Sequence, residues 1–335
     1  MDDPLRHHGD VEVGDLLDLA VNVYDGPRPP WLDDALHASL AGVGDYPSTE
    51  QAAAAVAHHH ARPVEDVLVT AGAAEAFTLV ARLRPWRRPV VVHPQFTEPH
   101  AALEQVGHRV SEVVLQAPFV LDPAAVPDDA DLVVVGNPTN PTGVLHPAGT
   151  IRALLRPGRL VLVDEAFMDC VPGEPESLAG LRHEGLVVVR SLTKHWSIPG
   201  IRAGYLLGSP ATTAGLARGQ VPWSVSAPAA AAVVACTSPQ AAEEARRRAE
   251  EIAGWRKVLE AGLDELGVHH LESQASFVLA QVGHGVHSRL RERGVAVRRA
   301  DTFPGLDGSW VRVAVRPPET TARLLAALRN DGRHD

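Results

Sequence analysis

Five short apolar runs constrain the fold of this chain more than any other feature. They occupy residues 67–70, 90–92, 132–135, 160–163 and 186–189 and consist mostly of valine and leucine. Their apolar residues fall on consecutive positions, which is typical of strands buried on both faces, as in a parallel sheet covered by helices. Stretches with helical character lie between them, at 73–83, 99–105 and 147–155. The sequence therefore predicts an α/β fold with a mostly parallel central sheet.

The character of the sequence changes twice along the chain. Residues 1–35 are rich in proline and irregular, and we interpret them as an N-terminal arm. Residues 36–222 hold the five runs and form the predicted large domain. Residues 223–335 contain a charged helical segment at 241–266, strand-like segments at 276–281 and 310–315, and a last helix at 319–329. They are predicted to form a smaller α+β C-terminal domain.

Charge and composition exclude several classes of partner. The net charge of −10 argues against nucleic acid, which usually requires a basic face. No apolar run reaches the roughly 18 residues of a membrane span, and the first ten residues lack the features of a signal peptide. Two cysteines, Cys170 and Cys236, cannot build a disulfide framework, so we expect a protein of the reducing cytoplasm. Three adjacent histidines at 58–60 point in different directions on a helix, and no metal site is predicted.

Polar segments follow the predicted strands, at 70–74, 136–143, 164–167 and 190–194. In open α/β sheets, ligands bind at the carboxyl ends of the strands. The first segment places Gly72, Ala73 and Ala74 in a turn that leads into a helix, where unbonded backbone N–H groups can cradle a phosphate. The chain has neither a G-x-G-x-x-G pattern nor a P-loop, so a dinucleotide or nucleoside triphosphate site is not expected.

Lysine is unusually rare. Only Lys194 and Lys257 occur among the 31 basic side chains. Arginine stays protonated, whereas lysine can lose its proton and attack a carbonyl. Lys257 lies in a helical stretch and is interpreted as a solvated charge. Lys194 follows the 186–189 run, so it is the candidate nucleophile.

Pyridoxal 5′-phosphate (PLP) is a cofactor whose needs these residues meet together. It requires a lysine for a Schiff base, an acid beside its pyridine nitrogen and a site for its phosphate dianion. Lys194, Asp164 and the Gly72 turn supply one of each. Further candidate phosphate donors are Ser191, Thr193 and Arg202. Taken alone, Asp164 could equally be a helix N-cap, a common role of aspartate after a strand.

Three motifs resemble those of class I/II aminotransferases of fold type I. They are residues 137–143 (Asn-Pro-Thr-Asn-Pro-Thr-Gly), 164–167 (Asp-Glu-Ala-Phe) and 191–194 (Ser-Leu-Thr-Lys), the last followed by Pro-Gly-Ile-Arg-Ala-Gly-Tyr at 199–205. Their order and spacing match the family, and the resemblance covers nearly the whole chain. It implies a homodimer with active sites at the subunit interface.

Within that class, several local stretches look most like the threonine-phosphate decarboxylases of cobalamin biosynthesis. They are residues 8–9, 164–169 with Pro172 and Glu174 following, 221–225, 303–307 and 312–316. Histidinol-phosphate aminotransferases are the neighbouring family, and they typically carry Tyr where this chain has Phe167. That phenol would hydrogen-bond the 3′ oxygen of the cofactor, so its replacement by Phe167 favours the decarboxylase interpretation.

The resemblance also implies roles for further residues. Phe96 is expected to stack on the pyridine ring, and Asn137 to hydrogen-bond the 3′ oxygen. Tyr46 is expected to reach the cofactor phosphate of the partner subunit. Candidates for binding a small phosphorylated amino-acid substrate are Arg312 and Arg298 for its anionic groups and Asn22 and His8 of the arm for its phosphate.

Departures from the family pattern leave some of these roles open. Ala73 and Ala74 stand where relatives often carry polar side chains, so the phosphate must rely more on backbone N–H groups. The arm segment 22–25 departs from the Asn-rich pattern of the decarboxylases. Arg298 could instead be a surface cation, and His8 and Asn22 could belong to a disordered terminus.

The main prediction for function is decarboxylation of L-threonine O-3-phosphate to (R)-1-aminopropan-2-yl phosphate in cobalamin biosynthesis. The alternative is transamination of histidinol phosphate or a related amino acid with a 2-oxo acid. The bond perpendicular to the cofactor ring breaks, so the substrate orientation that Arg312 imposes decides between loss of carbon dioxide and removal of the Cα proton by Lys194. The same residues support both reactions. A PLP-binding protein without turnover is a third possibility, which no added DNA-binding segment or basic patch supports.

Overall fold

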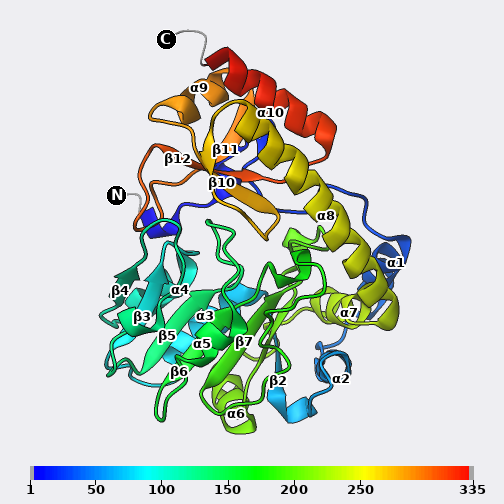
Figure 1. Ribbon diagram of the computed structural model, residues 1–335. Helices are drawn as coiled ribbons and strands as arrows, with labels where there is room; N and C mark the ends of the chain where they lie inside the picture. Colours follow the sequence, from blue (N-terminus) through cyan, green and yellow to red (C-terminus); the bar gives the residue numbers. More distant parts are fainter. Residues whose placement is uncertain (1–3, 332–335) are drawn as a thin grey trace.

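The computed structural model describes residues 4–331 and contains two β-sheets, one above the other in Figure 1. The larger sheet has seven strands in the order β2-β8-β7-β6-β5-β3-β4. The bounds of these strands are β2 Val67–Thr70, β3 Pro89–His93, β4 Ser111–Val114, β5 Leu132–Gly136, β6 Leu160–Asp164, β7 Leu186–Ser191 and β8 Gly204–Leu207. Only β8 runs antiparallel to its neighbours, β2 and β7. The predicted α/β class and mostly parallel sheet are confirmed.

All five apolar runs form strands, and their alternate residues enter two separate cores. Within β5, Val133 and Val135 belong to one core, whereas Leu132 and Val134 belong to the other. Each buried aliphatic side chain contributes roughly 1.5–3 kcal/mol, so burial on both faces explains why these runs lack alternation. The helices around this sheet are α2 Glu50–His59, α3 Ala73–Arg82, α4 Glu98–Gln105, α5 Ala148–Arg152, α6 Pro210–Gly219 and α7 Ala227–Cys236.

Two strands of the larger sheet were not among the five predicted. The edge strand β4 alternates between half-buried and exposed residues, so it has no continuous apolar run. Strand β8 begins at Gly204, where a Cβ atom would lie 3.0 Å from Cα of Gly72. That close approach brings the Gly72 turn against the sheet.

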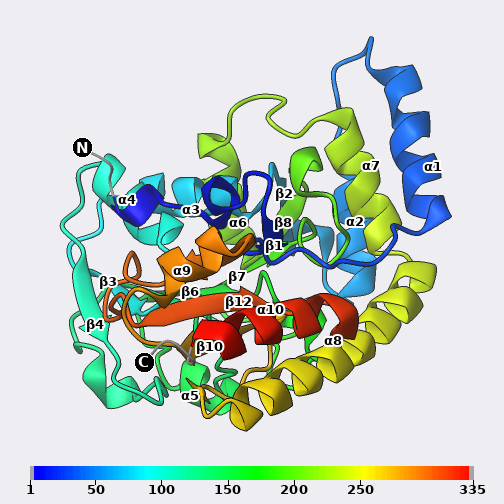
Figure 2. The same cartoon turned by 90° about the horizontal axis from the view of Figure 1, so that it is seen from above.

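The smaller sheet has five strands in the order β1-β11-β12-β10-β9. Their bounds are β1 Leu17–Leu19, β9 His269–His270, β10 Phe277–Gln281, β11 Val295–Arg299 and β12 Trp310–Ala314. Figure 2 shows three helices beside this sheet, namely α8 Pro239–Glu265, α9 Val286–Glu292 and α10 Pro318–Asp331. Leu259 of α8 and Leu324 of α10 join Phe277 in one core.

Residues 4–35 contain more regular structure than the sequence suggested. Strand β1 pairs in parallel with β11 of the smaller sheet, and helix α1 (Pro30–Ser39) begins inside the predicted arm. Arg316 holds the intervening segment by donating to the carbonyls of Asp18, Val21 and Val23 at 3.0, 2.7 and 2.8 Å. A three-residue strand carries too short a pattern to be recognised from sequence. The domain boundaries at 35 and 222 stay a prediction.

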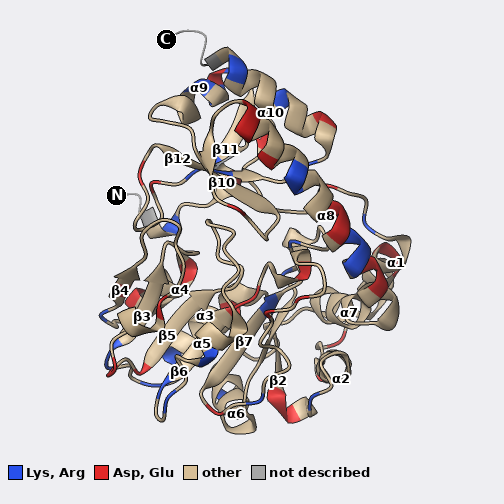
Figure 3. Ribbon diagram, viewed as in Figure 1, with Lys and Arg blue, Asp and Glu red and all other residues tan. Residues whose placement is uncertain are grey.

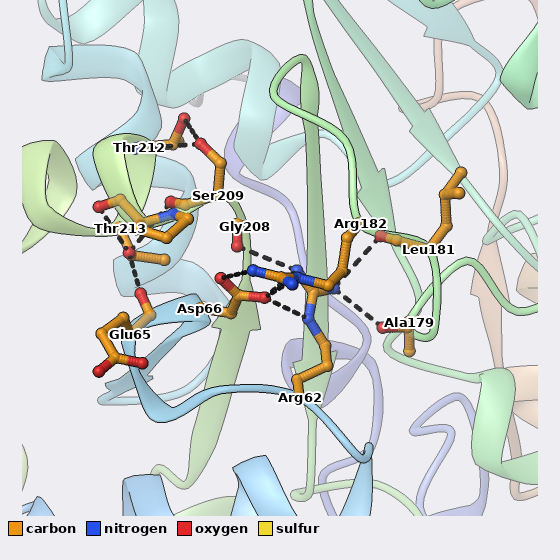
Figure 4. Close-up of polar contacts among 11 residues, drawn as sticks. Arg62, Glu65, Asp66, Ala179, Leu181, Arg182, Gly208, Ser209, Thr212 and Thr213 are labelled. Carbon is orange, nitrogen blue, oxygen red and sulfur yellow. Dashed lines mark hydrogen bonds and ion pairs between the residues drawn. The ribbon is translucent and has the colours of Figure 1, made fainter.

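A buried ion-pair network joins segments that flank the larger sheet (Figure 4). Arg62 donates to Asp66 at 3.1 Å and to the carbonyls of Ala179 and Gly208 at 3.0 Å each. Arg182 donates to the same Asp66 Oδ2 at 2.7 Å. Because Asp66 is fully buried, both guanidinium groups are needed to compensate its charge.

Charged residues of both signs alternate along α8 (Figure 3), where Arg247 and Arg248 both bond Glu244 at 2.8 Å. None of the helices in the described part of the chain is both long and apolar enough to cross a membrane.

Candidate active site

The carboxyl ends of three neighbouring strands bring the predicted residues together. Asp164 is the last residue of β6 and pairs in register with Gly136, the last residue of β5. Strand β7 ends at Ser191, three residues before Lys194. Across from them, Arg312 of β12 donates to Oδ1 of Asn140 at 2.6 Å. The site therefore lies between the two sheets, and residues of both contribute to it.

The Lys194 amine sits in an environment that favours its neutral form. Burial lowers the pKa of Lys194 to about 8, and the nearby Arg312 and Arg202 cations act in the same direction, while Asp10 opposes them. The segment is fixed because the Lys194 carbonyl accepts from the Tyr24 backbone N–H at 3.0 Å. About a tenth of this amine is thus unprotonated at pH 7, far more than for an ordinary lysine, and the neutral form is the one that attacks a carbonyl.

Asp164 is a buried carboxyl with local stabilisation only. Burial raises the pKa of Asp164 to about 7, and a hydrogen bond of 3.1 Å from the Ala166 N–H opposes this rise. Among the described residues, no basic side chain contributes to that pKa. The next helical turn begins at Met168 with Phe167 as its N-cap, so the alternative role of Asp164 as a helix N-cap is wrong. A buried carboxyl that lacks a cation fits a protonated pyridine nitrogen.

The predicted phosphate cradle forms where β2, β8 and β7 lie side by side. Gly72 has φ of +76°, and a Cβ atom there would lie 2.6 Å from Nη2 of Arg202, so only glycine allows this approach. Helix α3 begins directly afterwards at Ala73, with Ala74 exposed in its first turn. The hydroxyls of Ser191 and Thr193 are buried and 2.8 Å apart. A guanidinium, two hydroxyls and a helix N-terminus fit a phosphate dianion.

Asn137 does not occupy the position that we predicted for it. Its Nδ2 donates to the carbonyls of His146 at 3.1 Å and Glu176 at 3.4 Å, and its Oδ1 accepts from the His146 N–H at 2.7 Å. These bonds hold the loop after β5 and use both N–H donors of the amide, so it has no donor left for a 3′ oxygen. The amide that faces the site is Asn140, bonded to Arg312. The motif contains two asparagines three residues apart, and Asn140 rather than the predicted Asn137 hydrogen-bonds a candidate site residue.

Arg298 and Arg312 are opposite each other in the β11–β12 ladder. Both are buried, so the interpretation of Arg298 as a surface cation is wrong. Arg298 donates to the His7 carbonyl at 2.7 Å and to Thr302 at 2.6 Å. Arg312 donates to the Ala20 carbonyl at 2.6 Å. Both guanidinium groups therefore bind the arm as well as facing the region between the sheets.

The arm carries two further predicted residues to this region. Asn22 is buried, and neither polar atom of its side chain has a hydrogen-bond partner among the described residues. An amide left in that state costs about 1–3 kcal/mol unless a ligand satisfies it. Nε2 of His8 donates to the Glu98 carboxylate at 2.8 Å, and the His8 ring centroid is 5.9 Å from that of Phe96. The disordered terminus considered for both residues is not what the structure contains.

The two phenylalanines singled out from the sequence, Phe96 and Phe167, have different surroundings. Phe96 is half-buried between His8 and Phe77, whose ring centroid is 6.3 Å away. Phe167 is buried edge-on against Phe277 at 4.9 Å, within the core of the smaller sheet.

Tyr46, which was expected to act in the partner subunit, is a surface residue of this chain. Its side chain is 77% exposed and stacks on Trp223, itself 60% exposed, with ring centroids 4.3 Å apart. The sequence did not single out Asn140, which bonds Arg312, or Asp10, whose charge acts on Lys194. It also did not single out Glu98 of α4, which bonds His8 of the arm.

The fold and the site together define a PLP-dependent enzyme of fold type I. Residues 14–328 match the family model described as aminotransferase class I and II, and the chain belongs to this family. PLP is accordingly its cofactor. The solved structure of a histidinol-phosphate aminotransferase from Sinorhizobium meliloti in complex with PLP shares the fold, with a TM-score of 0.83, 20% identity and coverage of 93% of this chain and 90% of that chain.

The chain is similar to members of both families named in the sequence analysis, but to different degrees. A histidinol-phosphate aminotransferase of Mycobacterium tuberculosis is 46% identical over 98% of this chain and 92% of its own length. The threonine-phosphate decarboxylase of Salmonella typhimurium is 33% identical over 96% of this chain and 92% of its own. The histidinol-phosphate aminotransferase structure from Clostridium acetobutylicum has a TM-score of 0.88 at 23% identity, covering 96% of this chain and all of that one. The predicted order of resemblance, with the decarboxylases first, is therefore reversed.

Proposed function

We propose that this protein is an aminotransferase that moves the amino group of histidinol phosphate, or of a closely related phosphorylated amine, to a 2-oxo acid. The observation that carries the proposal is the 46% identity, over 98% of the chain, to a relative named as a histidinol-phosphate aminotransferase. The alternative weighed from the sequence thus becomes the leading candidate, and decarboxylation becomes the second.

Four residues are proposed to hold the cofactor by its two ends. Arg202, Ser191 and Thr193, with the backbone N–H groups of the Gly72 turn, bind the phosphate as charge-assisted and neutral donors. Asp164 stays ionised against the pyridine nitrogen, because a cation beside this buried carboxyl lowers its pKa from the raised value of about 7. Bound PLP supplies an electron sink for the bonds at the substrate Cα.

Lys194 is proposed to attach the cofactor and then to move the proton at the substrate Cα. Its depressed pKa suits both tasks, since a general base works best with a pKa near the operating pH. Near Lys194, Asn140 and Arg312 are hydrogen-bonded to each other. The Asn140 amide can therefore orient an oxygen atom of a bound ligand while the Arg312 guanidinium binds an anionic group.

The paired arginines suit substrates with an anionic end. Arg298 and Arg312 are cross-strand neighbours, so two guanidinium groups can meet one phosphate or a carboxylate. The unsatisfied amide of Asn22 lies in the same arm segment that Arg316 anchors. Arg298, Arg312 and Asn22 would bind the phosphorylated amine in one half-reaction and the 2-oxo acid in the other.

We also propose that the active molecule is a homodimer. Tyr46 and Trp223 form an exposed aromatic pair, and Leu40, Val43 and Val221 are exposed nearby in the sequence. Exposed apolar groups of this size indicate an interaction surface. A second copy seated there would bring Tyr46 to the neighbouring cofactor phosphate. Both cysteines are free and buried, which suits the cytoplasmic setting expected from the sequence.

Decarboxylation of L-threonine O-3-phosphate remains a second candidate because of Phe167. The position lacks the phenol typical of histidinol-phosphate aminotransferases, and the Salmonella decarboxylase matches 96% of the chain. This candidate would place the protein in cobalamin biosynthesis.

Proton NMR of the PLP-loaded enzyme separates the two candidates. With histidinol phosphate and 2-oxoglutarate, we expect loss of both substrates and accumulation of glutamate, and no turnover beyond a single equivalent per active site when the oxo acid is omitted. The same enzyme is incubated with L-threonine O-3-phosphate alone. Formation of 1-aminopropan-2-yl phosphate there, with no glutamate in the first mixture, would overturn the proposal in favour of the decarboxylase.

A further inference from the structure

Two buried histidines face each other at the edge of the larger sheet, outside the residues proposed to bind the cofactor. His93 is the last residue of β3, and His100 lies in α4. Nε2 of His93 is 3.0 Å from Nδ1 of His100, and both side chains are almost completely buried. Nδ1 of His93 is buried and has no hydrogen-bond partner among the described residues. A neutral imidazole offers a lone pair to a metal.

Two carboxylates complete the cluster around His100. Glu112 of the edge strand β4 lies 3.8 Å from Nδ1 of His100, on the same side as His93. Glu104, one turn further along α4, lies 3.4 Å from the other ring nitrogen, Nε2. Figure 1 shows α4, β3 and β4 together at one end of the larger sheet. Both carboxylates are partly exposed, so the cluster is reachable from solvent.

Neutral His100 cannot satisfy both carboxylates. If its proton is on Nε2, that nitrogen donates toward Glu104, and the lone pair of Nδ1 faces Glu112 and His93. If its proton is on Nδ1, the lone pair of Nε2 faces the Glu104 carboxylate instead. In the first tautomer the Nδ1 lone pair can accept from the Nε2–H of His93, 3.0 Å away, and Glu112 receives no hydrogen bond from the ring. In the second tautomer Glu104 receives none, so one carboxylate is left for a bound cation in either case.

The spacing of the three converging atoms suits a tetrahedral metal ion. Ligands held about 2.0–2.1 Å from Zn²⁺ in tetrahedral geometry lie about 3.3–3.4 Å from one another. The separations of 3.0 and 3.8 Å bracket that value, and one ligand atom from each of His93, His100 and Glu112 lies within 4.8 Å of the others. Glu104 then takes the place of the carboxylate that commonly fixes the ring of a metal-bound histidine.

We propose that His93, His100 and Glu112 form a binding site for a divalent transition-metal ion, Zn²⁺ in the first instance, with water as a fourth ligand. Two imidazole ligands and one carboxylate favour Zn²⁺ over Mg²⁺ or Ca²⁺, which prefer oxygen ligands alone. This site was not predicted from the sequence, because its ligands are spread over β3, α4 and β4.

Metal at this site would fix both ends of a segment that reaches the cofactor region. Residues 94–99 lie between the two histidines and include Phe96 and Glu98. Glu98 binds Arg6 and His8 of the arm at 3.1 and 2.8 Å. The metal is therefore a structural element that supports the ring of Phe96 and the docking of the arm, and it takes no part in bond making.

Calorimetric titration of the chelator-treated, PLP-loaded full chain with Zn²⁺ tests the proposal. We expect one Zn²⁺ per chain, and Co²⁺ in its place should give the intense visible d–d bands of a tetrahedral site. Glu112→Gln keeps the size of an exposed side chain and removes the carboxylate, so it should weaken the affinity at least about tenfold. Glu104→Gln should weaken it about 10- to 100-fold, as carboxylates behind ligating histidines do.

Controls distinguish this site from adventitious binding. His58→Ala removes an exposed histidine of α2 and should leave the affinity and the Co²⁺ spectrum unchanged. His100→Ala should abolish both, although its burial makes misfolding an additional risk, which the two glutamate variants avoid. Equal Zn²⁺ affinity of wild type and Glu112→Gln would overturn the proposal, as would binding that His58→Ala removes. So would absence of binding, which would mean that a proton occupies the cluster.

Discussion

Replacing Arg312 by methionine tests the site most broadly, because this one guanidinium has three separate roles. It donates to Asn140 and to the Ala20 carbonyl at 2.6 Å each, and its charge helps to depress the pKa of Lys194. Methionine has a similar length but neither donor nor charge. We therefore predict a loss of substrate affinity, weaker docking of the arm and a rise in the pKa of the lysine.

The size of each effect follows from burial. Truncating one partner of a buried, hydrogen-bonded charge pair costs about 2–5 kcal/mol. At 1.36 kcal/mol per factor of ten, kcat/KM for the phosphorylated amine should fall about 30- to 5,000-fold. The pKa of Lys194 should rise from about 8 but stay below its ordinary 10.5, because burial is the largest cause of the depression and persists in the variant.

Two assays read these effects independently. Steady-state kinetics give kcat/KM, and the pH dependence of PLP uptake by the apoprotein reports the pKa of the free Lys194 amine. Arg299→Gln, which changes the neighbouring arginine of β11 paired with Asp301 on the surface, is the matched control and should alter neither. A folded Arg312→Met variant with wild-type kcat/KM and an unshifted uptake profile would refute the placement of Arg312 at the site.

Three further predictions concern single side chains. Between pH 3.8 and about 7 the folded apoprotein keeps the Asp164 proton and the unfolded chain releases it, so this group makes the free energy of unfolding fall as pH rises through that range. Urea unfolding of Asp164→Asn at several pH values should show a smaller decrease. An equal pH dependence in wild type and variant would contradict the burial of this carboxyl. Asn140→Ala removes an acceptor of buried Arg312, and Asn137→Ala loses bonds to the His146 and Glu176 backbone, so each should destabilise the chain by about 1–3 kcal/mol in denaturant unfolding. Only Asn140→Ala should also lower the activity of the folded enzyme; a loss of activity in Asn137→Ala alone would favour Asn137 as the residue that faces the cofactor. Asp66→Asn leaves Arg62 and Arg182 without their shared carboxylate and should lower the free energy of unfolding, measured with denaturant, by about 3–5 kcal/mol. A decrease below about 1 kcal/mol would show that this ion-pair network does not stabilise the fold.

The sequence predicted the fold best where strands are buried on both faces of the sheet. Strands β5 and β6 are covered on both faces, so their continuous apolar runs were unmistakable, and the polar residues after them fell at the sheet edge. Lys194 and Asp164 could be selected because their chemistry depends on residue type and on position after a strand. Strand β1 was missed because three residues carry no period, and its pairing with β11 spans the length of the chain.

Roles that depend on side-chain direction could not be obtained from spacing. Asn137 and Asn140 lie in one motif, and only the fold determines which amide turns toward Arg312 and which toward the His146 backbone. Arg298 resembled a surface residue because its burial comes from the arm, through the His7 carbonyl. Phe167 suggested the decarboxylase, but a single position weighs less than 46% identity over nearly the whole chain.

Covalent attachment of PLP offers the most direct test of the central claim that Lys194 carries the cofactor. The PLP-loaded protein is reduced with borohydride, digested and mapped by mass spectrometry. Because the chain has only two lysines, the outcome is unambiguous. We predict the phosphopyridoxyl mass on the peptide that contains Lys194 and none on Lys257. Label on Lys257, or no stable label on either lysine, would contradict the assignment of the site.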